Sequence, residues 1–445
     1  MVDTVIVGAG ISGLSCAWFL RERGHRVQVL EAGARPGGTI QSAHQDGYLI
    51  EAGPNSTLMR NGALGELTRA LGLEAELLEA NKLAKRRYVV KDDRLVALPG
   101  SPPAFFVSPL FSTGAKLRLL LEPFHRRARA EESIAQFVRR RLGPEFLDWA
   151  IDPFVSGVYA GDPARLSVRA AVARIYALEA EHGSLILGAL AHWRQARAVG
   201  PMPVGRLISF RDGMQTLTQT LAESLGDAVR CGAEVSAIRR DDRGWLVETP
   251  AGAQRAARLV LSVPAYRAAT LLEPLDGELA AELAAIRYPP LVSVALGFGR
   301  EQVAHPLDGF GMLIPSRAGR RTLGVLFSST LFPGRAPAGQ VLLTAFIGGA
   351  RNEAIAGLDE AAIGQQVLGD LQPLLGILGA PRFQQLRRWP RAIPQYELGH
   401  LERLARIDAR LARLPGLQLR ANWRDGISVG DCVANAAQFA GRLSD

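Results

Sequence analysis

Apolar and polar positions recur with two different periods near the start of the chain, and together they predict a strand–helix–strand unit. Val5–Val7 form a short apolar run typical of a buried strand. Over residues 11–23 the apolar side chains recur at the spacing of one helix face, and Gly24 ends that pattern. Residues 26–30 then predict a second strand, parallel to the first. We therefore expect a βαβ unit over residues 3–33.

The same periodicities divide the rest of the chain. Residues 83–100 predict a hairpin that turns at Asp92-Asp93, and helical patterns dominate from about 114 to 204. The segment 266–388 alternates strands with helices, and its strands are mainly apolar. Further expected elements are a helix over 212–226, a hairpin over 233–250, a buried strand over 257–265, and sheet strands over 291–298, 309–315, 322–328 and 340–349.

Composition and charge narrow the possible partners. The chain has 445 residues, 48% of them hydrophobic, which suffices for more than one buried core. No run of 18 apolar residues occurs, and a strand predicted from Val2 leaves no room for a signal peptide, so we expect an intracellular protein. The net charge of +9 favours anionic lipid or an anionic substrate over nucleic acid, with base composition as the alternative source of the arginines. The cysteines Cys16, Cys231 and Cys432 lack the spacing of a disulfide framework or a metal site, and neither is expected.

Three glycines lie between the first predicted strand and helix, as Gly8-x-Gly10-x-x-Gly13. Gly8 permits a tight turn, Gly10 lets a pyrophosphate approach the backbone, and Gly13 lets the helix pack closely on the strand. The helix N-terminus then points at the phosphates. Glu31 follows the second strand, where a carboxylate accepts hydrogen bonds from a ribose diol. The spacing predicts a dinucleotide site. The alternative, a glycine-rich turn of another α/β protein, leaves the position of Glu31 unexplained.

A second glycine turn, within Arg35-Pro36-Gly37-Gly38-Thr39, follows Glu31 directly. Paired glycines allow another close backbone approach, which suits a cofactor whose reactive ring lies beyond its pyrophosphate. The arrangement resembles the large FAD-dependent group that includes amine oxidases, carotenoid desaturases and protoporphyrinogen oxidases. Rab-escort-type proteins share this fold without a flavin, and they are the non-enzyme alternative.

Four motifs narrow the resemblance. They are Glu51-Ala52-Gly53-Pro54-Asn55-Ser56, the stretch FVSGVYAGD at 154–162, Trp389-Pro390 with IPQYELGH at 393–400, and GISVGDC at 426–432. In this order they closely resemble the oxygen-dependent protoporphyrinogen oxidase family, nearly from end to end. The resemblance implies non-covalent FAD and the six-electron oxidation of protoporphyrinogen IX in heme biosynthesis, with O2 as the electron acceptor and peroxide as product. It also implies a cytoplasmic protein held peripherally on the cytoplasmic face of a bacterial membrane.

The fold implied is α/β. A Rossmann-like FAD-binding domain of the amine-oxidase type is joined to a mixed-sheet substrate domain and an inserted helical, membrane-facing domain. We assign 1–82, 205–265 and 389–445 to the FAD-binding domain, 83–204 to the substrate hairpin and helical region, and 266–388 to the substrate sheet. By resemblance, Val235 approaches the adenine through its backbone. The residues assigned to the flavin are Gly8, Ala9, Gly10, Ile11, Ser12, Gly13, Glu31, Ala32, Gly37, Gly38, Thr39, Gly53, Pro54, Asn55, Ser56, Val235, Trp389, Ile427, Ser428 and Val429.

The substrate chemistry needs positioning more than a strong base. A methylene bridge between two pyrroles loses hydride to give a delocalised cation, so the site is expected to be a wide apolar slot with one or two cations for the propionates. No acid, base or nucleophile is assigned. By resemblance the slot is lined by Gly157, Phe310, Leu313 and Phe346, with Arg87 as the propionate partner and Arg86 as the neighbouring candidate. The alternatives are aromatic side chains that belong to the core and arginines that are merely solvated.

The turn before the last predicted helix raises a separate question. By resemblance Ile427, Ser428 and Val429 lie against the flavin, where the positive end of the helix stabilises the charge of the reduced ring. Cys432 is then a packed residue, and a catalytic thiol is the alternative. The family usually has glycine where this chain has Ala421 and often where it has Ser428. If either position needs a positive φ, the substitution costs about 1 kcal/mol or more.

Several alternatives stay open at this stage. Amine oxidases usually keep a lysine near the flavin, and this chain has none after Lys116. A carotenoid desaturase would lack the IPQYELGH element, and an escort-type protein would carry no flavin. Coproporphyrinogen III, with four propionates, is the closest rival substrate. The apolar residues 102–111, followed by Arg126, Arg127 and Arg129, suit either a membrane surface or packing within a helical domain. A homodimer is a further candidate assembly.

Overall fold

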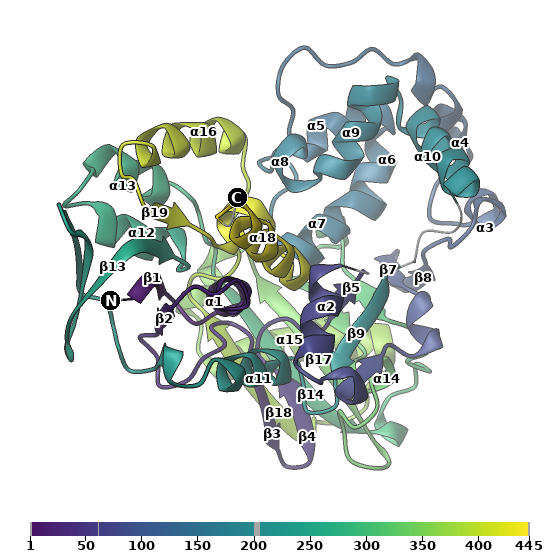
Figure 1. Ribbon diagram of the computed structural model, residues 1–445. Coiled ribbons are helices and arrows are strands. Elements are labelled where there is room, and N and C mark those ends of the chain that lie inside the picture. Colours follow the sequence, from purple (N-terminus) through teal and green to yellow (C-terminus); the bar gives the residue numbers. More distant parts are fainter. Residues whose placement is uncertain (1, 61, 200–204, 444–445) are drawn as a thin grey trace.

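The computed structural model describes residues 2–60, 62–199 and 205–443, and Figure 1 shows two large sheets with a helical region beside them. In the first sheet, β1 (Val2–Val7) and β2 (Val27–Leu30) pair in parallel and are joined by α1 (Ile11–Arg21), so the predicted βαβ unit is confirmed. The sheet order is β10 (Val229–Arg230), β2, β1, β13 (Gly252–Leu261), β12 (Gly244–Thr249) and β11 (Ala237–Asp241), with β19 (Leu417–Leu419) also beside β13.

Helices cover both faces of this sheet. One buried cluster joins α1 to α11 (Gln215–Leu225) and to α18 (Val429–Arg442), so helices from the two ends of the chain lie side by side (Figure 1). A second cluster, on the other face, holds α12 (Ala265–Leu272), α13 (Gly277–Ala284) and α16 (His400–Leu411). Most of residues 265–286 therefore pack on the first sheet, and Leu291 begins the second.

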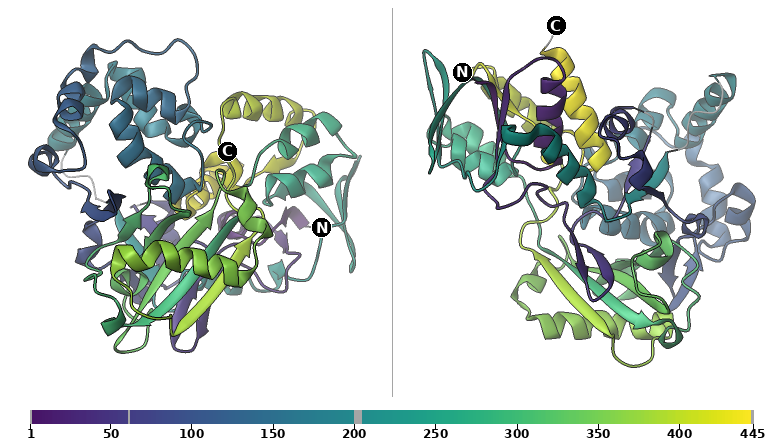
Figure 2. Two further views of the ribbon diagram at one scale, coloured as in Figure 1. Left: turned by 180° about the vertical axis from the view of Figure 1, so that it is seen from behind. Right: turned by 60° about the horizontal axis from the view of Figure 1, so that its bottom comes forward.

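The second sheet is mixed, and one long helix covers one of its faces. Its order is β18 (Phe383–Trp389), β14 (Leu291–Gly299), β17 (Gln340–Gly348), β16 (Thr322–Leu326), β15 (Gly311–Leu313), β7 (Tyr88–Lys91) and β8 (Arg94–Ala97). The cover is α15 (Glu360–Leu375), visible in the left view of Figure 2. The predicted hairpin forms as β7 and β8, and Asp92 and Asp93 turn it with φ of 50° and 55°. It joins this sheet through the parallel pair β7 and β15.

The helical region lies beside the second sheet in Figure 1, and its helix α7 (Asp152–Tyr159) contacts β15 and β16. Its other α-helices are α3 (Pro102–Val107), α4 (Thr113–Leu120), α5 (Ile134–Arg141), α6 (Pro144–Phe146), α8 (Val168–Ala171), α9 (Ala173–His182) and α10 (Leu185–Val199). A buried ion network holds it together, in which Arg141 pairs with Glu122 and Glu179. The last part of the predicted helical stretch, 200–204, lies outside the described residues.

Smaller elements complete the architecture. β3 (Ser42–Gln45) pairs with β4 (Tyr48–Glu51), and β5 (Thr57–Met59), β9 (Arg206–Phe210) and β6 (Leu77–Glu79) form a three-stranded sheet. α2 (Ala63–Ala70) packs near α18, and α14 (Ser328–Leu331) lies by β17. The mixed α/β class with two sheet domains is as predicted. Among the described helices, none combines the length and apolarity needed to cross a bilayer.

Candidate active site

The first glycine loop has the backbone geometry that its sequence predicts. Gly8 has φ of 103°, and a Cβ there would lie 2.6 Å from the Ser262 carbonyl oxygen. A Cβ on Gly13 would lie 2.0 Å from the carbonyl oxygen of Gly8, so the helix packs directly on the turn. By contrast, a Cβ on Gly10 would meet no atom within 4 Å. The backbone at Gly10 is therefore open to a ligand.

The Glu31 carboxylate is held at the end of β2 by backbone groups. It accepts hydrogen bonds from the Ala9 N–H at 2.7 Å and from the Gly33 N–H at 2.8 Å, while Ala32 is exposed beside it. The Glu31 carbonyl accepts the N–H of Ala233 at 2.8 Å, which brings the segment of the buried Val235 alongside. An oriented carboxylate still has lone pairs for a ribose diol.

The second glycine turn packs on the first. The N–H of Gly37 donates to the Ala9 carbonyl at 2.8 Å, and a Cβ on Gly38 would lie 3.3 Å from Cα of Gly10. The segment 53–56 follows, because a Cβ on Gly53 would lie 2.0 Å from the Thr39 carbonyl oxygen. Pro54, Asn55 and Ser56 are half-buried there. Predicted flavin residues from 8–13, 31–39 and 53–56 thus form one continuous track.

This track fits a dinucleotide. The first turn of α1 carries no acidic residue, and Gly10 offers no side-chain cap, so the amides of Ile11, Ser12 and Gly13 have no competing anion on their own helix. We expect 8–13 to hold the pyrophosphate and Glu31 a ribose. Bound FAD would supply the two-electron acceptor for substrate oxidation.

Trp389 reaches the track from the second sheet. Its indole N–H donates to the Ala52 carbonyl at 2.8 Å, and the Arg387 guanidinium stacks over its ring at 4.7 Å. The Ser293 hydroxyl also donates to the Ala52 carbonyl, at 3.4 Å. Strands β18 and β14 therefore fix the 52–56 segment, a tertiary contact that joins two motifs far apart in sequence.

The C-terminal turn carries the two positions where glycine is usual. Ser428 has φ of −78° and Ala421 has φ of −154°, both extended conformations, so neither substitution is strained. The positive φ falls on Gly426 instead, at 125°. Ser428 caps α18, its hydroxyl accepting the Asp431 N–H at 3.0 Å, and Val429 begins the helix. Cys432 is buried, with its Sγ donating to the Gly426 carbonyl at 3.8 Å, which describes a packed thiol.

Tyr396 fixes this turn from the IPQYELGH stretch. Its hydroxyl donates to the Asn422 carbonyl and accepts the Gly426 N–H at 2.9 Å. The His400 ring stacks on the Tyr396 ring, with centroids 4.4 Å apart, and burial lowers the pKa of His400 to about 4. The neutral His400 imidazole therefore packs against Tyr396, whose hydroxyl bonds to both Asn422 and Gly426 in the turn before Ile427.

Three strands of the second sheet place part of the predicted slot in one row. Leu313 on β15 is in register with Gly324 on β16, which is in register with Phe346 on β17. In-register residues share a face of the sheet, and a Cβ on Gly324 would lie 3.2 Å from Cδ2 of Leu313, so the absence of a side chain there lets Leu313 lie close to β16. Helix α7 closes on this row, since a Cβ on Gly157 would lie 2.5 Å from Cδ2 of Leu313.

Phe310 lies with the arginines of the hairpin. The Arg87 guanidinium stands over its ring at 5.1 Å, and the Phe310 N–H donates to the Arg86 carbonyl at 2.7 Å. The two arginines differ in charge balance. Arg86 forms an ion pair with Asp308, whereas Arg87 is exposed and has no carboxylate in ion-pair range among the described residues. The Tyr88 hydroxyl donates to Asp308 at 2.6 Å, and this bond together with Arg86 lowers the pKa of the carboxyl.

Sequence reasoning missed several residues of this site. Asp308 neutralises Arg86 from 222 positions away, and Gly324 acts by lacking a side chain. Asp152 is the first residue of α7, the helix that also carries Gly157. It pairs with Arg351 and accepts the Ser316 N–H at 2.8 Å, and these contacts hold the helix against the second sheet. No local pattern marks any of them, because each acts through a contact between distant segments.

Comparison with known proteins agrees with this geometry. Residues 11–441 match the family described as flavin containing amine oxidoreductase. The chain is 37% identical to a chloroplastic protoporphyrinogen oxidase of Oryza sativa subsp. japonica, over 100% of this chain and 88% of the rice protein. It is 30% identical to the coproporphyrinogen III oxidase of Bacillus subtilis (strain 168), over 96% of this chain and 95% of that protein.

A solved structure gives the same picture. A crystal structure of an Exiguobacterium sp. 255-15 protein, provisionally assigned as a protoporphyrinogen oxidase, superposes with a TM-score of 0.84 at 26% identity, covering 100% of this chain and 98% of the other. The predicted cofactor class and family are thus confirmed. This chain belongs to the flavin-containing amine oxidoreductase family, as an FAD-dependent oxidoreductase of the group that holds the protoporphyrinogen and coproporphyrinogen III oxidases.

Proposed function

We propose that this enzyme oxidises protoporphyrinogen IX to protoporphyrin IX. Each of three steps removes a hydride from the macrocycle to the flavin and a proton to solvent, and each consumes one O2 and yields one H2O2. The observation that carries this choice is the 37% identity with a protoporphyrinogen oxidase across the entire chain. The site residues assigned by resemblance remain part of the proposal.

The chain's own residues would act by positioning. The row Leu313, Gly324 and Phe346 offers an apolar wall, and Gly157 lets α7 approach it. A flat tetrapyrrole held there needs little acid–base assistance, since the cation left by hydride loss is delocalised over two pyrroles. Arg87, over Phe310, would hold a propionate through a charge-assisted hydrogen bond.

Charge balance supports two propionates over four. Of the two candidate arginines, Arg86 is already neutralised by Asp308, and Arg87 has no ion-pair partner among the described residues. Coproporphyrinogen III would bring four carboxylates to this edge, and uncompensated carboxylates repel one another. It remains the second candidate because of the Bacillus relative.

Anaerobic reduction of the holoenzyme tests the assignment directly. We expect protoporphyrinogen IX to bleach the bound flavin faster than coproporphyrinogen III at equal concentration, with porphyrin fluorescence appearing once O2 is admitted to reoxidise the flavin. Faster bleaching by coproporphyrinogen III would make it the preferred substrate and protoporphyrinogen IX the second candidate. Bleaching by an amine or a carotene, and by neither porphyrinogen, would refute the proposal.

Two matched variants test the propionate contact. Arg87→Gln should lower kcat/KM by tenfold or more, since hydrogen bonds to charged groups are worth about 1.5–3 kcal/mol. Arg86→Gln should cost much less, because Asp308 already occupies that guanidinium. Flavin content should be unchanged in both. A larger loss for Arg86→Gln would reverse the assignment of the two arginines.

We also propose that the helical region contacts a membrane surface. Large apolar side chains are exposed on and beside α3 and α4, including Val107 at 83% and Phe124 at 84%. The exposed Arg126 and Arg129 follow, so an apolar edge adjoins a cationic one, as on surface-bound proteins. Val107→Ser with Phe124→Ser should reduce cosedimentation with phosphatidylglycerol vesicles. Leu378→Ser, which is 72% exposed elsewhere, is the control, and equal binding by all forms would refute the contact.

A further inference from the structure

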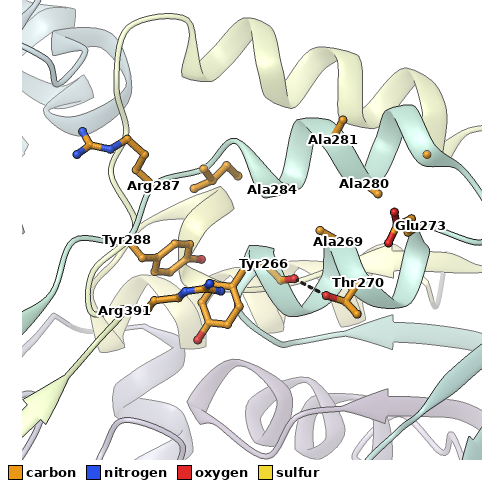
Figure 3. A pocket seen from close by; sticks show the side chains of 12 residues that line it. Tyr266, Ala269, Thr270, Glu273, Ala280, Ala281, Ala284, Arg287, Tyr288 and Arg391 are labelled. Atoms are coloured by element: carbon orange, nitrogen blue, oxygen red, sulfur yellow. Dashed lines mark hydrogen bonds between the residues drawn. The ribbon is translucent and has the colours of Figure 1, made fainter.

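A cavity of about 560 Å³ lies between α12 and α13 (Figure 3). Its volume falls within the range of about 300–1,000 Å³ that is typical of small-molecule sites. None of its lining residues is among those assigned above to the flavin or to the porphyrinogen. An occupant of this cavity would therefore be distinct from the flavin and the porphyrinogen, and the lining indicates its chemistry.

One end of the cavity is cationic and aromatic. The Arg391 guanidinium stacks over the Tyr266 ring at 4.4 Å, and the Tyr288 ring meets Tyr266 edge-on at 5.2 Å; all three gather at the same end in Figure 3. Arg287 also lines the cavity, but it is paired with Glu353 and Glu397. Arg391 is exposed and has no carboxylate in ion-pair range within the described part of the chain.

The tyrosine hydroxyl at this end can act as a donor to a ligand. The Tyr288 oxygen accepts the Ala265 N–H at 3.0 Å, so its own hydrogen is directed elsewhere, and no acceptor for it is found among the described residues. Burial raises the pKa of Tyr288, so the hydroxyl stays protonated at neutral pH. A protonated hydroxyl beside a guanidinium favours an anionic acceptor.

The middle of the cavity is apolar, and the end far from Arg391 is acidic. Methyl groups of Ala269, Ala280 and Ala284 line it between the two helices, and Ile286 adds a further apolar surface. Glu273 stands at the end far from Arg391 in Figure 3, with no cation in ion-pair range among the described residues. A second negative charge on a ligand would be repelled there.

We propose that this cavity binds a small monocarboxylate with an apolar body, its carboxylate on Arg391 and the Tyr288 hydroxyl and its body along the alanine walls. One cation fixes the head group, the methyl walls take the body, and Glu273 disfavours a dicarboxylate. The site is independent of the proposed reaction, because it shares no assigned residue with the porphyrinogen slot.

Binding of 2-naphthoate to the holoenzyme, measured by calorimetry, tests this site. We expect saturable binding, weakened at least tenfold for 2-naphthylmethanol, which lacks the charge, and for 2,6-naphthalenedicarboxylate, whose second carboxylate faces Glu273. Arg391→Gln should weaken 2-naphthoate at least tenfold. Ala284→Trp, on an exposed position of α13, should do the same by filling the cavity.

Two controls separate this site from other surfaces. Arg169→Gln removes another arginine stacked on a tyrosine, 5.9 Å from the Tyr176 ring, and should leave binding unchanged. Arg87→Gln reports on the porphyrinogen slot and should also leave it unchanged. No binding at millimolar 2-naphthoate, a loss under tenfold in Arg391→Gln or Ala284→Trp, or a comparable loss in Arg87→Gln would each overturn the proposal. Porphyrinogen turnover decides the reaction separately.

Discussion

Replacing Glu51 with glutamine perturbs a buried carboxyl that adjoins the flavin track. Glu51 is 3% exposed and accepts hydrogen bonds from the Ser42 hydroxyl at 2.6 Å and the Met214 N–H at 2.8 Å. Arg335, 2% exposed, lies 3.8 Å away, but its N–H groups donate to Ser209 and to carbonyls of 210–211. Burial outweighs these partners and raises the pKa of Glu51 from 4.5 to about 7.

The sign of the effect follows from proton linkage. Between about pH 4.5 and 7 the folded protein holds a proton on Glu51 that the unfolded chain releases, so the free energy of unfolding falls as pH rises through this window. At 1.36 kcal/mol per pKa unit, a rise from 4.5 to about 7 corresponds to about 3 kcal/mol at most. Glu51→Gln keeps the shape and removes the titration.

Urea unfolding of both holoenzymes at several pH values from 5 to 8 measures this effect. We expect the wild type to lose stability relative to Glu51→Gln as pH rises, most steeply midway between the two pKa values, just under about pH 6, with the loss levelling off above about pH 7. Glu223→Gln, on the exposed part of α11, is the matched control and should show no such trend. If the wild type instead became more stable relative to Glu51→Gln as pH rises, Arg335 would be keeping the carboxylate charged. That result would refute the reasoning.

Three further substitutions test other parts of the structure. Arg141→Met leaves the buried Glu122 carboxylate unpaired, removes one of the two arginines on Glu179, and should cost about 3–5 kcal/mol in urea unfolding, against little for the exposed Arg139→Met; similar values for both would contradict a structural ion network. Cys432→Ala should keep bound FAD and most activity, because the thiol is packed; lost turnover with FAD retained would make it catalytic. Gly157→Ala pushes a methyl onto Leu313 and should raise KM without loss of FAD, so an unchanged KM would place the slot elsewhere.

Local pattern predicted the parts of the fold that local chemistry determines. The glycines of 8–13 follow from a turn and a close helix contact, and both are seen at Gly8 and Gly13. The Asp92-Asp93 turn follows from a polar break between apolar runs. In each case the residues that act on one another are near neighbours in sequence, so their spacing carries the information.

The remaining features depend on pairings that spacing does not encode. The hairpin β7–β8 joins a sheet whose other strands begin at Leu291, and Asp308 meets Arg86 there. Strain at Ala421 or Ser428 was a question because the sequence does not reveal which residue of the turn has a positive φ. In the structure that residue is Gly426. Such outcomes depend on the packing of whole domains rather than on the propensity of a segment.

The IPQYELGH stretch joins segments that lie far apart in the sequence. Gln395 donates to the Tyr159 carbonyl at the end of α7, Gly399 donates to the Glu131 carboxylate, and Tyr396 spans the turn before α18. One short segment thus sets the helical region and the C-terminal turn relative to each other. If hydride loss from a porphyrinogen requires placement rather than a base, this joint matters for the reaction, because a shift here moves the Gly157 side of the proposed slot against the flavin side.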